Sequence, residues 1–185
     1  MSSEKVVSLL MSWLTLEIVA CRACGGDCRL QMAPLEYGSR VLSETADLMA
    51  DIRITAGPYA FTARFDHNAA PKTCAWFRSI LPYRERLIHV CWSGEACWIP
   101  LGGLDPGLGY ENATSFPAPG QVLFYPTGVS ETEILIAYGA VRFASKAGQL
   151  AGNPFLTIVE GLEHLRALGE LTLRRGAQDI EFAAI

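Results

Sequence analysis

The sequence lacks the features that mark two large classes of function. No apolar run reaches the roughly 18 residues that a membrane-spanning helix requires. Lysine and arginine make up only 15 of the 185 residues, they form no cluster, and the formal net charge is −4. Nucleic-acid binding depends on clustered cations that contact phosphates. We therefore expect neither a membrane span nor a nucleic-acid partner.

Familiar catalytic and cofactor-binding motifs are also missing. The sequence contains no G-x-S-x-G and no H-E-x-x-H, and its three histidines fit no Ser-His-Asp set. His67 falls in a predicted loop and His164 on a charged helix face, so we expect both at the surface. The sequence shows no evident cofactor and singles out no metal ligands, and it leaves open whether a metal is used and whether the protein is an enzyme.

The chain does contain enough apolar material for a core. Half of the residues are hydrophobic, 18% are charged, and a length of 185 residues fits one domain. A disulfide scaffold is not expected in a chain this long, so we predict free thiols in a reducing compartment, the cytoplasm. The six cysteines are Cys21, Cys24, Cys28, Cys74, Cys91 and Cys97.

The first 48 residues differ in character from the rest and allow two functional interpretations. Cys21 and Cys24 form a C-x-x-C pair with Cys28 nearby, which is half of a zinc knuckle, but no second half follows. The segment "IVAC" matches a lipobox that would anchor a lipoprotein at Cys21, although Glu17 interrupts the apolar stretch before it.

A mis-assigned start is the interpretation that we favour for this contrast. Met49 opens "MADIRITAGPYAFTARF", which reads like a genuine start followed at once by a strand. Residues 1–48 would then be a helical or disordered extension, and residues 49–185 would form the folded domain.

Hydrophobic periodicity predicts a mainly β domain with two helices. Strands are indicated at "DIRIT", "YAFTARF", "RLIHVCW", "EACWIP", "QVLFYP", "TEILIAY" and "NPFLTIV". Helices are indicated at "APKTCAWFRSILP", where Pro71 suits the first helical position, and at "EGLEHLRALGEL". Many short strands with two helices indicate an antiparallel barrel or sandwich.

Two segments carry a resemblance to known families. "APKTCAWFRSIL" resembles the opening of a cyclophilin helix. "ENATSFPAPGQVLFYPTGVSETEILIAYGAVRFASKAGQLAGN" is more specific and resembles an uncharacterised bacterial and archaeal family of cyclophilin-like proteins, a domain-of-unknown-function group. The resemblance implies a closed, cyclophilin-like antiparallel β-barrel of about eight strands with two helices, and it implies no known reaction.

The sequence departs from the pattern of cyclophilin prolyl isomerases. Those enzymes follow the helix with a strand that bears a catalytic arginine, and further residues, including a glutamine, line the proline groove. Here the segment reads "RLIHVCWSGEACWIP", and Arg84 and Arg86 belong to the lead-in before it. Prolyl isomerisation therefore remains only an alternative.

The same segment concentrates reactive side chains on what we predict to be a hairpin. With a two-residue turn at Ser93-Gly94, His89 would oppose Trp98, and Trp92 would oppose Glu95. Cys91 and Cys97 would point to opposite faces, so they could neither bridge nor share a metal. The candidate ligand-binding residues of this segment are His89, Trp92, Glu95 and Trp98.

Further candidates come from three other segments. Glu131 and Glu133 lie two apart at the start of a strand, about 6.5–7 Å between Cα atoms. Paired carboxylates at that separation can bind a hard cation, recognise an amine, or divide acid and base roles. "YENATS" adds two loop residues, and "RFASKAGQLAGN" offers hydrogen-bond donors between glycines that could hold a carboxylate. These segments contribute Glu111, Asn112, Glu131, Glu133, Arg142, Ser145, Lys146 and Asn153.

These residues favour a small polar metabolite as the partner, bound or transformed at the rim of the barrel. A molecule with both an amine and a carboxylate would suit the mixed charges. The first alternative is a module without chemistry that associates with itself or another protein through apolar residues such as Phe116, Phe124 and Phe155. The second alternative is a prolyl isomerase.

Overall fold

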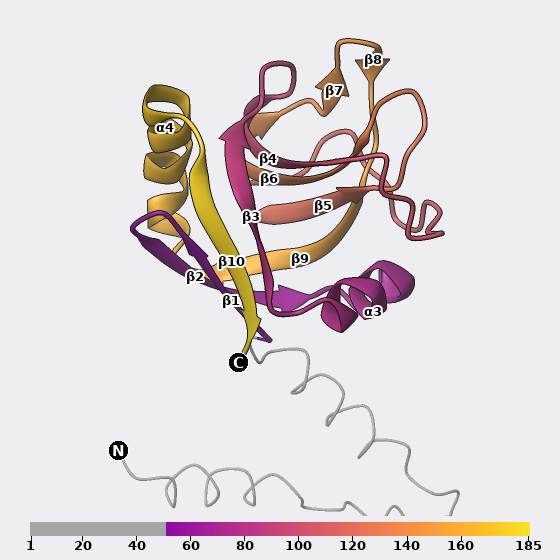
Figure 1. The fold of residues 1–185 in the computed structure, drawn as a ribbon, viewed down its shortest axis with the longest axis horizontal. Helices are drawn as coiled ribbons and strands as arrows, with labels where there is room; N and C mark the ends of the chain where they lie inside the picture. Colours follow the sequence, from indigo (N-terminus) through magenta and orange to yellow (C-terminus); the bar gives the residue numbers. More distant parts are fainter. Residues whose placement is uncertain (1–50) are drawn as a thin grey trace, which may run out of the picture. The chain divides into compact units, whose positions relative to one another are not determined.

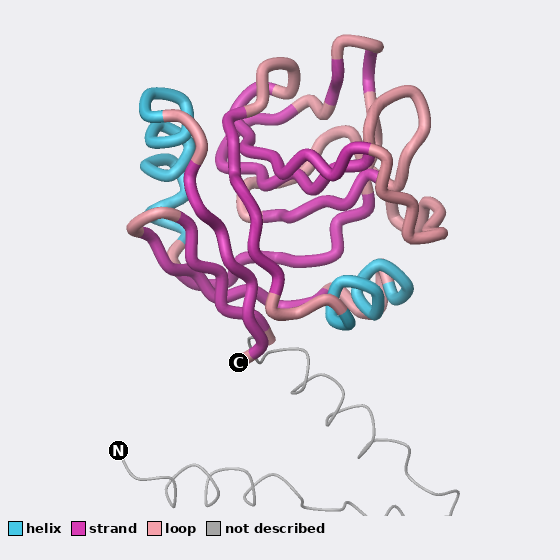
Figure 2. Tube along the Cα trace, viewed as in Figure 1, coloured by secondary structure: helices cyan, strands magenta, loops and turns pink. Residues whose placement is uncertain are grey.

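The folded domain is a closed barrel of eight antiparallel strands, which confirms the predicted cyclophilin-like fold (Figures 1 and 2). The computed structural model describes residues 51–185. Around the barrel the strands follow the order β1-β10-β3-β4-β6-β5-β9-β2. Their bounds are β1 Ile52–Ala56, β2 Tyr59–Phe65, β3 Tyr83–His89, β4 Gly94–Gly102, β5 Gln121–Tyr125, β6 Thr132–Val141, β9 Asn153–Glu160 and β10 Gln178–Ala184.

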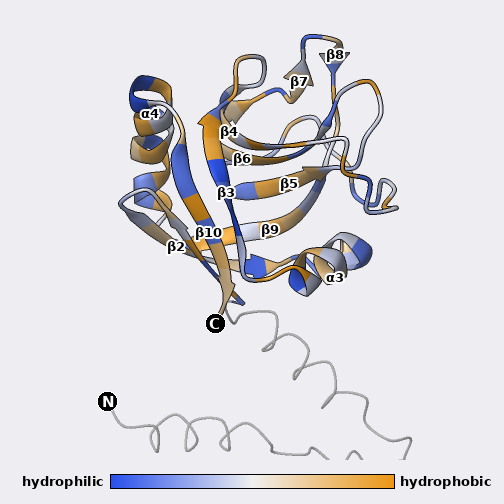
Figure 3. Ribbon diagram, in the orientation of Figure 1, coloured by the Kyte–Doolittle hydropathy of each residue, from blue (hydrophilic) through white to orange (hydrophobic). Residues whose placement is uncertain are grey.

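The barrel forms because the strands alternate apolar and polar side chains. In β1, Ile52 and Ile54 are buried while Arg53 and Thr55 are exposed, because successive side chains of a strand point to opposite faces. The same alternation is visible along β10 in Figure 3. The inward side chains of all eight strands meet in one apolar core.

Two helices cover opposite sides of the barrel (Figure 1). Helix α3 (Pro71–Ser79) places Phe77 in the core, with ring centroids 4.9 Å from Phe155 and 5.1 Å from Phe182. Helix α4 (Leu165–Arg175), preceded by the 3-10 turn η1 (Leu162–His164), buries its apolar face against the barrel. Both helices lie in the segments where the sequence predicts them.

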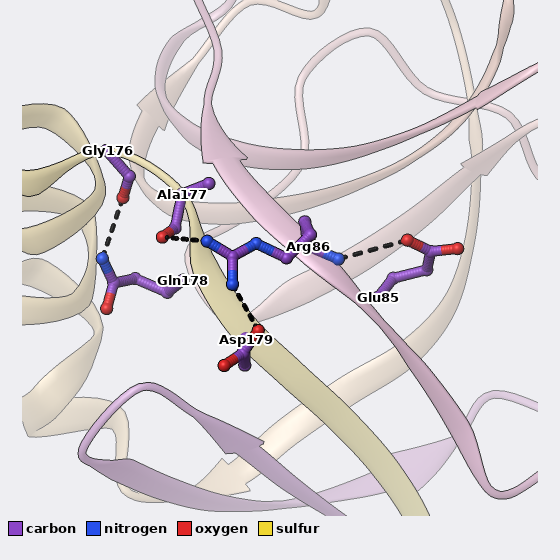
Figure 4. A network of polar contacts seen from close by, with 6 residues as sticks. All are labelled: Glu85, Arg86, Gly176, Ala177, Gln178 and Asp179. Carbon is purple, nitrogen blue, oxygen red and sulfur yellow. Dashed lines mark hydrogen bonds and ion pairs between the residues drawn. The ribbon is translucent and has the colours of Figure 1, made fainter.

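Strand β10 is the barrel strand that the sequence analysis missed, and it closes the barrel. It pairs with β1 on one side and with β3 on the other. Exposed ion pairs reinforce the β3–β10 ladder, one between Arg84 and Glu181 and one between Arg86 and Asp179. The Arg86 guanidinium also donates to the Ala177 carbonyl over 2.9 Å (Figure 4).

A second layer covers the outer face of β4, β5 and β6. Leu123 and Leu135 point away from the barrel interior and pack against Phe143 and Leu150 from the segment that follows β6. This segment contains the small hairpin of β7 (Ala144–Ser145) and β8 (Gly148–Gln149). Within residues 51–185, no helix has the length and apolar character to cross a membrane.

Candidate functional site

A cavity of about 260 Å³ lies where the second layer meets the outer face of the barrel. Its residues come from the end of β3 and the loop after it, from β4, from the start of β6, and from the β7–β8 hairpin. They are Ile88, His89, Val90, Cys91, Trp92, Trp98, Ser130, Glu131, Glu133, Ala144, Ser145 and Lys146. Seven of the residues predicted for a ligand site therefore surround this one cavity.

Glu133 is the most unusual residue of the cavity because it is 5% exposed and its carboxyl group has no partner. Within the described residues, no hydrogen bond or ion pair satisfies this side chain. Its neighbours across the sheet are Pro100 on β4 and Tyr125 on β5. The Tyr125 hydroxyl accepts a bond from the Val129 backbone N–H over 3.1 Å. The carboxyl oxygens are not fully enclosed, because among the described residues the only fully buried side-chain nitrogen or oxygen without a partner is Asn112 Oδ1. The Glu133 carboxyl borders the cavity and is therefore open to a ligand that enters it.

The electrostatic setting of Glu133 favours its protonated form. Burial, as the main cause, and the negative charge of Glu131, as the second, together raise the pKa of Glu133 to about 8. Glu131 lies just before β6 and is exposed, yet it borders the same cavity. Strongly raised carboxyl pKa values inside a cavity are typical of functional sites.

The β7–β8 hairpin supplies the cationic side of the cavity. Lys146 lies in its turn and Ser145 at the end of β7. Lys146 forms no ion pair with either glutamate within the described part of the chain. Trp98 forms part of the wall, and Trp92, 61% exposed, stands at its edge. The cavity thus combines two carboxyl groups, one ammonium group and two indole rings.

A family model described as "Protein of unknown function (DUF3830)" matches residues 52–184. The chain belongs to the DUF3830 family. This result confirms the resemblance that the sequence carries. No curated protein matches the chain.

Among solved structures, the DUF3830 protein is similar to "Structure of McbB in complex with tryptophan". The TM-score is 0.56 and the sequence identity is 16%. The match covers 71% of this chain and 44% of the McbB chain, so this protein spans less than half of that structure. At this identity the similarity shows a shared fold and nothing more.

The hairpin at the start of β4 differs from the prediction by one residue of register. Ile88 pairs with Trp98 and His89 pairs with Cys97, so His89 and Trp98 lie on opposite faces and do not oppose each other. The two-residue turn is also wrong. Ser93 is held away from a tight turn because its hydroxyl donates to the Ala144 carbonyl over 2.9 Å and accepts from the Ala144 N–H.

The register places His89 and Glu95 toward α4 and away from the cavity's carboxyl groups. The His89 ring, although it borders the cavity, lies with Nε2 2.8 Å from the Tyr138 hydroxyl. Glu95 accepts bonds from the Ala140 N–H over 2.8 Å and from the Arg166 guanidinium over 3.0 Å. Glu95 therefore joins β4, β6 and α4, and it does not line the cavity.

The prediction that Cys91 and Cys97 point to opposite faces agrees with the structure. Cys91 is exposed and Cys97 is buried, and both thiols are free. They form no disulfide.

Three further candidates of this DUF3830 protein lie at α3, away from the cavity. Glu111 accepts bonds from the backbone N–H groups of Lys72 and Thr73, each over 2.9 Å, and from the Thr73 hydroxyl over 2.6 Å. Asn153 donates to the same hydroxyl, and Asn112 donates to a backbone carbonyl of β9. These contacts hold the start of α3, where helix N–H groups lack partners. The predicted grouping of these three residues with the rim site is therefore wrong.

Arg142 lies in a neighbouring, open groove of about 680 Å³ and donates to the Gln149 side chain over 3.0 Å. Phe116 also lines this groove and is 65% exposed. Phe124 and Phe155, predicted to be exposed, are instead fully buried because they point into the barrel from β5 and β9.

Sequence reasoning missed some residues of the cavity. The five residues that were not predicted are Ile88, Val90, Cys91, Ser130 and Ala144. Ser130 directly precedes Glu131, so the polar run "SETE" was the signal that could have identified it. Ile88 and Val90 gave no such signal, because an apolar residue that lines a cavity and one that packs in the core look alike in sequence.

The arginines considered for prolyl isomerisation are engaged elsewhere. Arg84 and Arg86 form ion pairs with β10 on the exposed side of β3. The zinc and lipoprotein interpretations concern residues 1–48, which lie outside the described residues. The cytoplasmic location stays a prediction.

Proposed function

We propose that this DUF3830 protein binds a small polar metabolite in the cavity around Glu133. The observation that carries the proposal is the buried carboxyl group of Glu133, which borders a cavity and has no partner within residues 51–185. A hydrogen bond to a charged group contributes about 1.5–3 kcal/mol in net terms. A ligand that pairs with this carboxyl inside the cavity would gain such a contribution, which favours binding.

The size and lining of the cavity support a small ligand. Pockets for drug-sized molecules measure roughly 300–1,000 Å³, and this cavity measures about 260 Å³. Six of the twelve lining residues are apolar or weakly polar and six are polar or charged, so the cavity offers both packing surface and several groups that can orient a ligand. Glu133 would receive an amine and Lys146 a carboxylate, so a molecule with both groups fits best. Tryptophan, with which the McbB structure was solved, belongs to this chemical class, although the likeness is one of fold alone.

A thermal-shift screen of the full chain tests this proposal. Amines, carboxylic acids, amino acids and neutral alcohols are supplied at millimolar concentration. A ligand that binds only the native state stabilises it by about 2.7 kcal/mol when present at a hundredfold excess over its Kd. We expect at least one of these classes to raise the Tm of the wild type, and Glu133→Gln or Lys146→Ala to reduce the shift.

Glu163→Gln is the matched control because Glu163 is an exposed residue of η1 that does not line the cavity. It should keep the full shift. If no compound class shifts the wild type, or if Glu133→Gln leaves every shift unchanged, the cavity is not the binding site.

Self-association remains a second candidate because two large apolar side chains share one groove. Trp92 and Phe116 are 61% and 65% exposed and both line the open groove beside the cavity. Sedimentation velocity over a range of concentrations tests this function. A dimer that Phe116→Ser dissociates would support it, and a monomer at all concentrations would rule it out.

A further inference from the structure

We infer that the ligand presents an ammonium group to Glu133 and that one proton leaves the protein for each ligand bound. The inference rests on the proposed function, since it specifies which chemical group enters the cavity. It also adds a property that binding alone does not require, namely a link between ligand affinity and pH.

The first support is the hydrogen-bonding capacity around Glu133. Pro100, its neighbour on β4, has no backbone N–H and an apolar side chain. Tyr125, its neighbour on β5, uses its hydroxyl with the Val129 N–H. Among the described residues no hydrogen bond from either strand neighbour reaches this carboxyl, although an ionised carboxylate has capacity for about four hydrogen bonds. An ammonium group carries three N–H donors and would fill most of that capacity.

The second support is the balance of charge around Glu133. On its own strand and the preceding loop it meets Glu131, and β4 and β5 contribute no ionised side chain next to it. From β3 and the following loop, His89 and Cys91 border the cavity, and the β7–β8 turn contributes Lys146. With both glutamates ionised, the cavity holds two negative charges against one positive charge. One ligand cation neutralises the difference.

The aromatic side chains add a third support. Trp98 and Trp92 both line the cavity that contains the two glutamates. The face of an indole ring attracts cations, and this attraction strengthens when water is excluded. Indole rings beside carboxylates are therefore a suitable surface for an ammonium group.

The proton balance follows from the state of Glu133 before binding. Burial and the charge of Glu131 keep the pKa of Glu133 near 8, so the empty site holds a neutral carboxyl at neutral pH. Entry of R–NH₃⁺ stabilises the carboxylate, the O–H bond of the carboxyl breaks, and the proton passes to the buffer. The product is a carboxylate–ammonium pair, and charge and atoms balance without any other reactant. A neutral carboxyl that merely donated to a ligand acceptor would release no proton.

The test is isothermal titration calorimetry of the full chain with four probes that share a phenylalkyl body. These are phenethylamine (cation), L-phenylalanine (zwitterion), 3-phenylpropionate (anion) and 2-phenylethanol (neutral). Titrations in two buffers of different ionisation enthalpy count the protons released, and titrations across pH measure the linkage. We expect the amine-bearing probes to bind with close to one proton released below pH 8. Their Kd should fall about tenfold for each pH unit up to about pH 8 and then level off.

Glu133→Gln should raise the Kd of the cationic probes at least tenfold and abolish both the pH dependence and the proton release. Glu131→Gln removes only the neighbouring charge, so it should retain binding and reduce the proton release at neutral pH. Glu163→Gln again serves as the exposed control and should behave as the wild type.

Three results would overturn the inference. They are binding of the neutral or anionic probe in preference to the amines, amine binding without proton release, and no binding of the amines at all. The first two results leave the proposed cavity function standing, provided that the binding still depends on Glu133. Failure of every compound class in the thermal-shift screen would remove the proposed function as well.

Discussion

Replacing Glu133 with glutamine should stabilise the protein, and the gain should grow with pH. Glutamine preserves the size of the side chain but cannot ionise. Unfolding exposes Glu133 to water, where its pKa returns from about 8 to its ordinary value of 4.5. Between these two values the native state holds a proton that the unfolded state has lost. Folding stability therefore falls as the pH rises through this interval.

The size of the effect follows from the same two pKa values. Each pKa unit corresponds to about 1.4 kcal/mol. Below pH 4.5 Glu133 is protonated in both states and causes no loss of stability. Above this pH the free energy of unfolding of the wild type decreases by about 1.4 kcal/mol for each pH unit, until the pH passes about 8. The total approaches 5 kcal/mol, as an order of magnitude, because the side chain is only 5% exposed and solvent screens it little. The variant lacks this dependence.

Urea denaturation of the two proteins at several pH values from about 5 to 9 measures the prediction, with midpoints and slopes converted to free energies of unfolding. Other titrating groups are shared, so the difference between the two curves isolates Glu133. We expect this difference to rise up to about pH 8 and then to stay constant, whereas Glu163→Gln should show no trend. Parallel curves for wild type and Glu133→Gln would refute the reasoning, since they would mean that Glu133 ionises normally in the native state.

Three other predictions test the structure around the cavity. Glu111→Ala removes the acceptor for the first N–H groups of α3 and should cost about 1–2 kcal/mol in denaturation, as the loss of an N-terminal cap does; an unchanged midpoint would contradict this role. Gly94→Ala should cost about 1–3 kcal/mol, because Gly94 has φ +90° and an added Cβ would lie 2.8 Å from a backbone carbonyl oxygen of β6; wild-type stability would show that the strand entry adjusts freely. Among the described cysteines, Cys91 should react first with iodoacetamide, as read by peptide mass spectrometry. Burial raises the pKa of Cys74 to about 12 and that of Cys97 to about 11, so these thiols should react only after unfolding.

Period-2 alternation was enough to predict seven strands, and Pro71 together with a helical apolar face was enough to predict both helices near their observed positions. The eighth strand has the same alternation at Ile180 and Phe182 but follows directly on α4 and its glycine. The register of the β3–β4 hairpin could not be predicted, since Ser93 is fixed by Ala144, a residue 51 positions later in the sequence. Contacts of this range are not encoded in a local pattern.

The types of residue at the candidate site could be predicted from the sequence, but only part of the set that the fold brings together could be. Glu131 and Glu133, two apart in the sequence, border one cavity, and the β7–β8 turn brings Lys146 to the same cavity. Glu111 and Glu95 have the same residue type but serve as acceptors for backbone N–H groups. Sequence shows that a glutamate is present, whereas its role depends on which donors the fold brings within reach.

The position of β10 has a consequence for how the domain is made. This strand lies between β1 and β3, so a growing chain that has been synthesised only as far as α4 leaves one edge of each strand unpaired. Unpaired strand edges are templates for association with other chains. During synthesis the domain is therefore a sheet with two open edges until its last strand emerges, and only then can it become a barrel. A ribosome that pauses after α4 would expose these edges for longer, and a chaperone that covers β1 or β3 would act within this interval.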